Sequence, residues 1–151
     1  MLRYITMEIL NRKAGFDYTI LETIEAGIAL VGCEVKSIRA GSASIKESYA
    51  RAKGAEIFLV NMHIAPYAQG NIHNPPETRE RKLLLKRREI NKLIGQLQQK
   101  RLYLVPLKVY LKKNRHVKVL LGLGQPKKMY DKKEKKKQRD IERELRRDFK
   151  L

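Results

Sequence analysis

Short stretches rich in β-branched, aromatic and other apolar residues recur six times along the chain, and each predicts a β-strand. Gly54 and its neighbours separate two of them and residues 112–114 separate two others, so both pairs predict hairpins. A bend at residues 25–27 separates the first two strands, and Pro106 predicts an edge position or a bulge in the fifth. The six strands are expected at 16–22, 28–32, 44–52, 56–61, 101–111 and 115–123.

Two further stretches show the three- and four-residue spacing of amphipathic helices. Val35 and Ile38 precede Gly41, which predicts a short helix that stops at the glycine. A longer helix is predicted to begin at Thr78, after a proline-rich segment at 63–77 that should be a loop. Its apolar face comprises Leu83, Leu84, Ile90, Leu93, Ile94 and Leu97.

These elements predict a mainly β protein: a small antiparallel barrel of about six strands, with two or three helices packed at its openings. Closing the sheet protects strand edges that would otherwise stay unpaired. At 151 residues the chain is the size of one domain. That domain is expected over 11–124, after a loosely attached leader at 1–10 in which Met7 is a second possible start.

A basic C-terminal tail is expected at 125–151. Between residues 127 and 137 the chain carries seven lysines against two acidic residues. Ile141, Leu145 and Phe149 lie four apart and form a thin apolar stripe on a potential helix. This surface is too small to offset the entropy lost on ordering, so the tail is predicted to be disordered in isolation.

The net charge of +18 and the pI near 10.2 point to a polyanionic partner. No apolar run approaches the roughly 20 residues of a spanning helix, and the first ten residues lack the pattern of a signal peptide. Cys33 is the single cysteine, which fits a reducing compartment and a small buried side chain. We therefore expect a cytoplasmic protein with no membrane partner.

Candidate catalytic chemistry is sparse. His63, His73 and His116 are scattered, without the spacing of a metal site, and the chain has no glycine-rich phosphate loop. No carboxylate pair stands out for acid and base work. We predict a binding protein that is not an enzyme, with no cofactor and no metal.

Basic residues interleave with aromatic ones near the start of the predicted domain. Arg12 and Lys13 are suited to phosphates, while Phe16 or Tyr18 offers a stacking face; Tyr18 could equally belong to the core, and Phe16 is the ring expected to be exposed. A second basic cluster comprises Arg79, Arg81, Lys82, Lys86, Arg87 and Arg88. Charge supplies affinity without sequence preference, so specificity has to come from shape.

Six segments, in order, resemble the small protein B family, the tmRNA-binding proteins of bacterial trans-translation. They are NRKAGFDY at 11–18, EAGIALVGCEVKSIRAG at 25–41, HIAPY at 63–67, RERKLLLKRREI at 79–90, VPLKVYLKKNRHVKV at 105–119 and KKMYDKKEKKKQRD at 127–140. The resemblance implies a six-stranded OB-like barrel. It also implies a protein that binds the tRNA-like domain of tmRNA and delivers it to ribosomes stalled on messages without a stop codon.

The resemblance assigns tmRNA binding to Glu25, Leu84 and Lys118. Lys118 can contact phosphate, and Leu84 can pack or touch an RNA loop; Glu25 can accept hydrogen bonds from sugar or base groups, or orient a neighbouring cation. The full set expected to bind tmRNA is Asn11, Arg12, Lys13, Phe16, Glu25, Arg81, Lys82, Leu84 and Lys118.

The resemblance also implies that the tail becomes helical on ribosome binding and senses the empty decoding centre and messenger channel of the small subunit. Alanyl-tRNA synthetase and elongation factor Tu are implied as functional partners with aminoacylated tmRNA. The ribosome-binding residues of the tail are expected to be Lys127, Lys128, Tyr130, Asp131, Lys132, Lys133, Lys136, Lys137 and Arg139.

The chain departs from the family pattern in two places. Gln125 and Pro126 replace a lysine and a glycine, and Lys133 replaces an arginine, so a bidentate contact at Lys133 is in doubt. Two alternatives stay open: a ribosomal protein or general OB-fold translation factor, and a metal-dependent ribonuclease.

Overall fold

The computed structural model describes residues 7–68, 74–99, 101–113 and 115–148. In chain order its elements are β1 (Glu8–Leu10), α1 (Arg12–Asp17), β2 (Tyr18–Ile28), α2 (Gly32–Arg39), β3 (Ala43–Ser44), β4 (Tyr49–Lys53), β5 (Glu56–Val60), β6 (His63–Ile64), β7 (Arg81–Leu84), α3 (Arg87–Gln99), β8 (Tyr103–Lys112), β9 (His116–Pro126) and α4 (Met129–Asp148).

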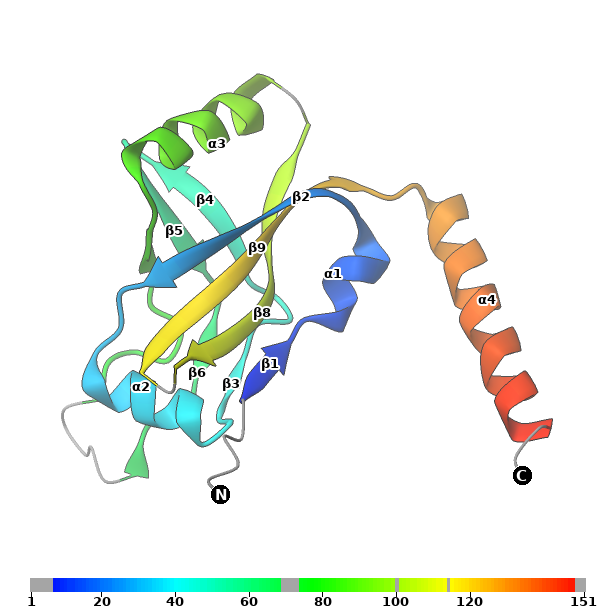
Figure 1. The fold of residues 1–151 in the computed structure, drawn as a ribbon, viewed down its shortest axis with the longest axis horizontal. Helices are drawn as coiled ribbons and strands as arrows, with labels where there is room; N and C mark the ends of the chain where they lie inside the picture. The colour runs from blue at the N-terminus through cyan, green and yellow to red at the C-terminus, as the bar shows by residue number, and fades with distance from the viewer. Residues whose placement is uncertain (1–6, 69–73, 100, 114, 149–151) are drawn as a thin grey trace.

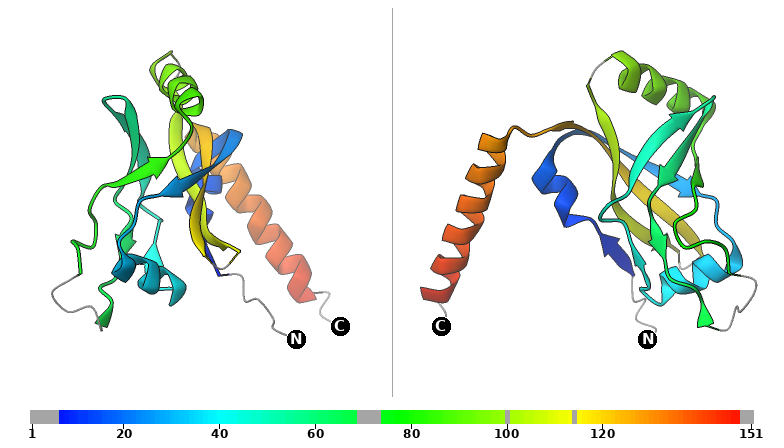
Figure 2. Two further views of the ribbon diagram at one scale, coloured as in Figure 1. Left: turned by 60° about the vertical axis from the view of Figure 1, so that its left-hand side comes forward. Right: turned by 180° about the vertical axis from the view of Figure 1, so that it is seen from behind.

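Six antiparallel strands close into a ring, as predicted. The order is β8-β4-β5-β7-β2-β9, and β9 pairs back onto β8, while β1 pairs with a later part of β8 than β4 does. The twist of the strands around the ring is visible in Figures 1 and 2. A separate pair, β3 and β6, lies beside α2.

The core fills the ring and extends under the helices at its two ends. Ile57, Leu59 and Leu83 are completely buried inside the barrel. At one opening α3 buries Ile90 and Leu93, and at the other α2 buries Ile38; Figure 1 shows these two helices at opposite ends of the barrel. Burial of each such side chain stabilises the fold by about 1.5–3 kcal/mol. Each helix therefore closes one opening of the barrel and is held there by its buried apolar side chains.

The structure confirms several local predictions. The helix over Gly32–Arg39 is followed by Gly41 in a left-handed conformation with φ of 79°. Both hairpins form, and the first turns at Gly54 with φ of 63°. The register between β8 and β9 shifts between Pro106 and Lys108, which is the bulge predicted for Pro106.

The predicted pair of strands around a bend at residues 25–27 is wrong. Residues 12–17 instead form α1, because the side chain of Asn11 caps the helix and accepts a hydrogen bond from the Ala14 amide at 3.3 Å. One strand, β2, then runs without interruption through 25–27. Its pairing with β9 extends from Tyr18 to Gly27 and includes a register shift between Ile20 and Glu22.

The helix predicted from Thr78 is also wrong over its first part. Residues 81–84 form β7, in which Arg81 and Leu83 are buried and the two residues between and after them are exposed. Pairing with β5 on one side and β2 on the other imposes this two-residue period. The helix proper, α3, begins at Arg87.

The two ends of the chain also differ from expectation. Residues 8–10, placed in the leader by the sequence analysis, form β1 and pair with β8. Residues 129–148, predicted to be disordered in isolation, form α4. Ile141 and Leu145 are about half exposed on this helix, so burial contributes little to it. Long straight-chain residues and acid–base spacings such as that of Glu142 and Arg146 favour the helix locally.

Candidate nucleic-acid interface

Three neighbouring strands, β7, β2 and β9, place residues that are far apart in the sequence side by side. Gly27 on β2 lies opposite Lys118 on β9 and, on its other side, opposite Leu84 on β7. Glu25 lies two residues before Gly27 on the same strand and therefore points to the same face. The three residues that the family resemblance assigned to tmRNA binding thus meet around one glycine.

The surface at this point is a groove with a volume of about 450 Å³. Strands β2, β7 and β9 form its floor, and the start of α3 forms one wall. Its lining residues are Glu25, Gly27, Glu56, Lys82, Leu83, Leu84, Leu85, Lys86, Arg87, Glu89, Ile90 and Lys118. Four cations and three carboxylates share this lining, so the groove is nearly balanced in charge although the chain as a whole is strongly basic.

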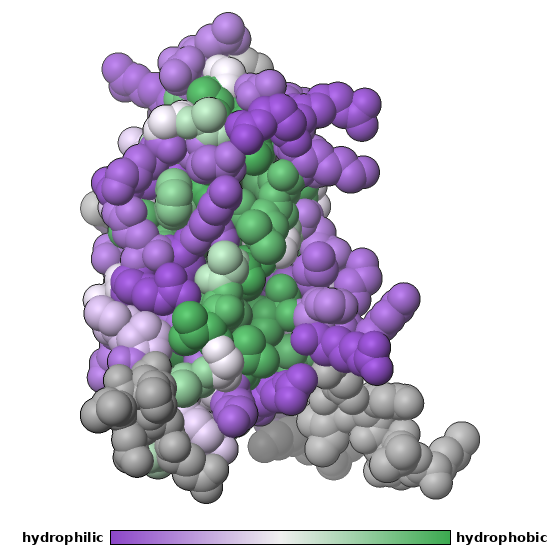
Figure 3. Space-filling view, turned by 90° about the vertical axis from the view of Figure 1, so that its left-hand side faces the viewer, coloured by the Kyte–Doolittle hydropathy of each residue, from purple (hydrophilic) through white to green (hydrophobic). Residues whose placement is uncertain are grey.

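Leu84 supplies an exposed apolar surface in the groove. Its side chain is 51% exposed, and it lies over the backbone of Gly27, where an added Cβ would come within 3.1 Å of Leu84 Cβ. Figure 3 shows a hydrophobic band running down one face of the molecule between hydrophilic side chains. An exposed apolar residue among cations suits a ligand that carries both phosphates and unstacked bases.

Glu25 contributes a carboxylate whose two oxygens are both occupied. The hydroxyl of Tyr110 donates to Oε2, and Lys112 Nζ lies 3.0 Å from Oε1. The hydrogen bond from Tyr110, then that from Lys112, lowers the pKa of the Glu25 carboxyl, and the nearby charge of Lys118 acts in the same direction. Burial and the contact with Glu25 raise the pKa of Tyr110 to about 12. The phenol is therefore protonated, and Glu25 ionised, at neutral pH.

Glu56 holds two of the cations at the other side of the groove. Its carboxylate lies 2.7 Å from Arg87 and 3.7 Å from Lys82, and the hydrogen bond from Arg87 is the main reason why the pKa of Glu56 is lowered. Within the described part of the chain, Lys86 and Lys118 have no carboxylate paired with them. These two lysines are the groove cations available to a phosphate.

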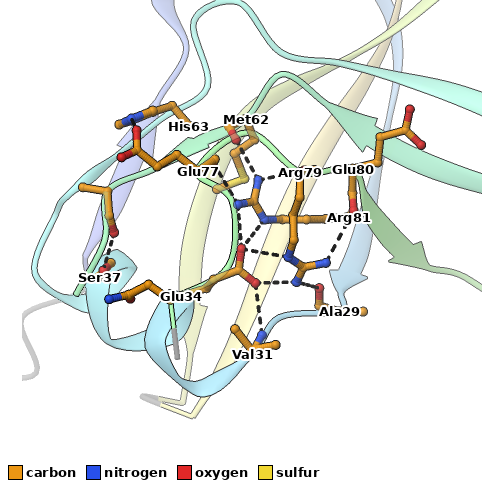
Figure 4. Close-up of polar contacts among 12 residues, drawn as sticks. Ala29, Val31, Glu34, Ser37, Met62, His63, Glu77, Arg79, Glu80 and Arg81 are labelled. Carbon is orange, nitrogen blue, oxygen red and sulfur yellow. Dashed lines mark hydrogen bonds and ion pairs between the residues drawn. The ribbon is translucent and has the colours of Figure 1, made fainter. Parts of the chain in front are cut away.

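Arg81, expected to contact RNA, is instead completely buried. Its guanidinium donates to Glu34 Oε2 at 2.6 Å, to the Met62 carbonyl at 2.7 Å and to the Glu77 carbonyl at 3.0 Å. Arg79, whose side chain is 28% exposed, contacts the same Glu34 carboxylate, as Figure 4 shows. Arg81 therefore fixes α2 against β7 and has no surface to offer an RNA.

The electrostatics of this buried cluster follow from its hydrogen bonds. Burial by itself raises the pKa of Glu34, but hydrogen bonds from Arg79, the Val31 amide and Arg81 outweigh it, and the pKa of Glu34 is lowered. Burial lowers the pKa of Arg81, against the opposing effect of Glu34. Both groups are charged at neutral pH, and each satisfies the other.

The expected RNA-binding residues near α1 lie apart from the groove. Tyr18 and Glu25 are seven residue steps apart along β2, which corresponds to roughly 23 Å of strand. Asn11 is buried and donates to the carbonyls of Ile45 and Pro106, so its role is structural. Arg12 is exposed, and Lys13 is paired with Glu47 at 3.0 Å.

The start of the tail packs against α1. Lys127 and Lys135 both donate to the Gly15 carbonyl, the former at 3.0 Å. The guanidinium of Arg139 lies 5.0 Å from the centre of the Phe16 ring, so a cation of the tail covers the ring that was expected to stack on RNA. Among the other expected tail residues, Lys128, Lys133, Lys136 and Lys137 are exposed, and the side chains of Tyr130, Asp131 and Lys132 lie outside those described.

Sequence reasoning missed Glu56, which lines the groove, and it missed Tyr110 and Lys112, which contact the groove residue Glu25 from β8. Tyr110 and Lys112 alternate along β8 and so share a face, and Tyr110 lies opposite Lys118. This alternation in the sequence, on a strand paired with that of Lys118, could have identified Tyr110 and Lys112. No sequence pattern identifies Glu56, because its contact with Arg87 depends on how α3 meets the β4–β5 hairpin.

The described residues contain no group of three or more His, Cys, Asp or Glu side chains that could hold a metal ion. None of their helices is both long and apolar enough to cross a membrane.

Comparison with known proteins places the chain among relatives of similar length. The family model described as "SmpB protein" matches residues 8–151. A protein of Acetivibrio thermocellus named "SsrA-binding protein" is 59% identical over 135 residues, which cover 89% of this chain and 87% of that protein. A Bacillus subtilis protein of the same name is 55% identical over 139 residues, covering 92% of this chain and 88% of the relative.

A solved structure agrees with the sequence comparisons. It is described as "tmRNA-SmpB: a journey to the center of the bacterial ribosome", and its matching chain is 48% identical to this one with a TM-score of 0.68. The match covers 85% of this chain and 93% of that chain. Since the family model spans nearly the whole sequence and the barrel is shared, this chain belongs to the SmpB protein family.

Proposed function

We propose that this chain binds the tRNA-like domain of tmRNA through the groove between β7, β2 and β9, and delivers it to ribosomes stalled on messages without a stop codon. One observation carries the proposal: Glu25, Leu84 and Lys118 are far apart in sequence but converge on one groove. The names of the relatives and the description of the solved structure support the same RNA as ligand.

The mechanism of recognition follows from the chemistry of the groove. Lys118 and Lys86 offer ammonium groups to phosphates, and Leu84 offers an apolar surface to an unstacked base or a ribose. The carboxylates of Glu25 and Glu56 limit the net charge. A nearly balanced groove penalises indiscriminate binding of polyanions and favours an RNA whose shape places its phosphates at the unpaired lysines.

The tail is proposed to act on the ribosome. A basic helix of 20 residues is roughly 30 Å long, which suits a channel lined by ribosomal RNA phosphates. An intact messenger would occupy that channel, so the tail could enter it only when the messenger has ended. Tyr130 is proposed to stack on a base of the decoding centre. Alanyl-tRNA synthetase and elongation factor Tu would act on the same RNA at its aminoacylated end.

A competition experiment tests the proposed ligand. The labelled tRNA-like domain of tmRNA is bound to the full-length chain at physiological salt, and excess tRNA or ribosomal RNA fragments are added. Retention of the labelled complex is the expected result. Equal competition by all structured RNAs would contradict the proposal and favour a general RNA-binding translation factor. RNA cleavage with Mg²⁺ that an acidic substitution abolishes would favour a ribonuclease.

A further inference from the structure

The Glu25 carboxylate makes its contacts across a strand rather than along one. Glu25 is on β2, whereas Tyr110 and Lys112 are both on β8, and β9 lies between these two strands. Tyr110 lies opposite Lys118 on β9, and Lys118 lies opposite Gly27 on β2. The Glu25 side chain therefore spans the strand that carries Lys118.

This arrangement leaves Glu25 poorly suited to contact RNA on its own. Both carboxylate oxygens already have donors, and a carboxylate facing phosphates would be repelled. Its two partners are better placed. The Lys112 side chain is 52% exposed and carries a positive charge that the Glu25 contact holds near Lys118.

The contact with Glu25 also fixes the hydrogen-bonding role of the Tyr110 hydroxyl. Its hydrogen is committed to Glu25 Oε2, so toward a ligand the phenol oxygen can act only as an acceptor. Lys108 Nζ lies 5.1 Å from the centre of the Tyr110 ring, which leaves one face less open to stacking. An acceptor beside the ammonium groups of Lys112 and Lys118 is suited to the 2′-hydroxyl of a ribose, the group that distinguishes RNA from DNA.

We infer that Tyr110 and Lys112 are direct RNA contacts beside Lys118, Tyr110 accepting a hydrogen bond from a ribose 2′-hydroxyl and Lys112 binding a phosphate, and that Glu25 is a positioning residue which holds both. This inference rests on the proposed function. It adds two contacts on β8 to the groove and gives the acidic residue an indirect role.

A double-mutant cycle distinguishes positioning from direct contact. The affinity for the tRNA-like domain of tmRNA is measured at several salt concentrations for Glu25→Gln, Lys112→Met and the double variant. Lys112→Met should weaken binding about tenfold and reduce the salt slope by about 0.9. Adding Glu25→Gln to Lys112→Met should then cost much less than Glu25→Gln costs alone. Fully multiplicative effects would show that Glu25 meets RNA directly and would overturn the inference.

The matched control is the exposed pair of Lys53 and Glu80, with Nζ and Oε2 at 3.5 Å. It is also a lysine–glutamate pair on the barrel surface, but its lysine pairs with Glu80, whereas Lys112 pairs with Glu25 beside Lys118. Lys53→Met and Glu80→Gln should leave both the affinity and the salt slope unchanged. A loss in the control as large as that of Lys112→Met would reduce the effect to general charge and overturn the role of Lys112.

Tyr110→Phe tests the hydroxyl. It should weaken binding without changing the salt slope, because no charge is removed. Transcripts of the tRNA-like domain with randomly placed 2′-deoxy nucleotides then locate the contact: at least one ribose should weaken binding of the unaltered protein but not of Tyr110→Phe. Absence of any such ribose would overturn the assignment of Tyr110. If the unaltered protein shows no preference for tmRNA, the proposed function itself fails, which is a distinguishable result.

Discussion

Leu84 lies across Gly27 on the neighbouring strand, and the absence of a side chain at Gly27 is what lets it lie there. Gly27→Ala would place a Cβ within 3.1 Å of Leu84 Cβ. Leu84 Cβ is bonded to the β7 backbone, so β7 would have to move from β2 by a few tenths of an ångström and would carry Leu84 out of its position over Gly27. The affinity for the tRNA-like domain should fall as a result, which a filter-binding titration would measure.

Gly95→Ala is the matched control for that substitution. Gly95 lies in α3, and no atom lies within 4 Å of the position of an added Cβ. Alanine there should raise the free energy of unfolding by about 0.5–1 kcal/mol, because it favours the helix. RNA affinity should stay the same. Loss of affinity in both variants, or in neither, would remove Gly27 from the site.

Lys118 should contribute to affinity through charge. Lys118→Ala should reduce the slope of log affinity against log salt by about 0.9, as expected for one phosphate contact. Lys36 on α2 does not line the groove, and Lys36→Ala serves as a control with the same change in charge. Equal slopes for the two variants would mean that Lys118 contributes only to the general charge.

The buried pair of Glu34 and Arg81 should govern stability. Glu34→Gln leaves two guanidinium groups without their carboxylate and should lower the free energy of unfolding by about 3–5 kcal/mol. Chemical denaturation measures this change. The double variant Glu34→Leu/Arg81→Met should recover much of the loss, because it removes both buried charges. Equal instability of the single and double variants would contradict this account.

The same pair predicts how stability depends on pH. The folded-state pKa of Glu34 lies below its ordinary value of 4.5. Its contribution is therefore fully present above that value and is lost as the pH falls through the lower folded-state pKa. The difference in unfolding free energy between the unaltered chain and Glu34→Gln should shrink below pH 4.5. A difference that stays constant from pH 7 to pH 3 would contradict the assignment.

Removal of the tail should separate RNA binding from action on the ribosome. Deletion of residues 129–151 keeps Lys127, whose amide donates to the Asp17 carbonyl and whose Nζ donates to the Gly15 carbonyl. Affinity for the tRNA-like domain should be largely retained, while peptide tagging in a translation assay should be lost. A parallel loss of both would identify the tail as an RNA-affinity device.

A double substitution in α4 tests whether the tail acts through its charges or through its exposed apolar side chains. Ile141→Ala/Leu145→Ala keeps every charge and favours the helix, but removes the two large apolar side chains exposed on α4. Tagging should persist if contacts with ribosomal RNA phosphates hold the tail on the ribosome. Loss of tagging would instead indicate that the stripe packs on the ribosome.

The barrel was predictable from sequence, whereas β7 was not, and the reason lies in one arginine. Buried positions on a half-exposed strand normally carry apolar residues, so the alternation of buried and exposed positions in β7 is concealed by Arg81. Its burial is possible only because Glu34, 47 residues earlier, supplies the opposite charge. The pairing of Glu34 with Arg81 depends on the tertiary structure, so the local sequence pattern does not reveal it. Leu84 was therefore assigned to the wrong kind of element, although the structure places it in the same groove as Glu25 and Lys118.

The site itself was predictable in part. The resemblance to a family pointed to Glu25, Leu84 and Lys118, and the structure brings them together. Tyr110 and Lys112 escaped notice because their connection to Glu25 crosses a strand that lies between them in the ring but not in the sequence. Cross-strand geometry of this kind depends on register, which local patterns leave open.

Strand β2 sets the distance between the two regions that are proposed to bind RNA, the groove and the tail. It begins next to α1, where Lys127 and Lys135 anchor the tail, and it ends at the groove. A strand paired along its length cannot stretch, so the distance between groove and tail is set by a residue count. Each inserted residue would add about 3.3 Å and turn the following side chains to the opposite face, unless a bulge absorbed it. The irregularity between Ile20 and Glu22 is already one such adjustment of length.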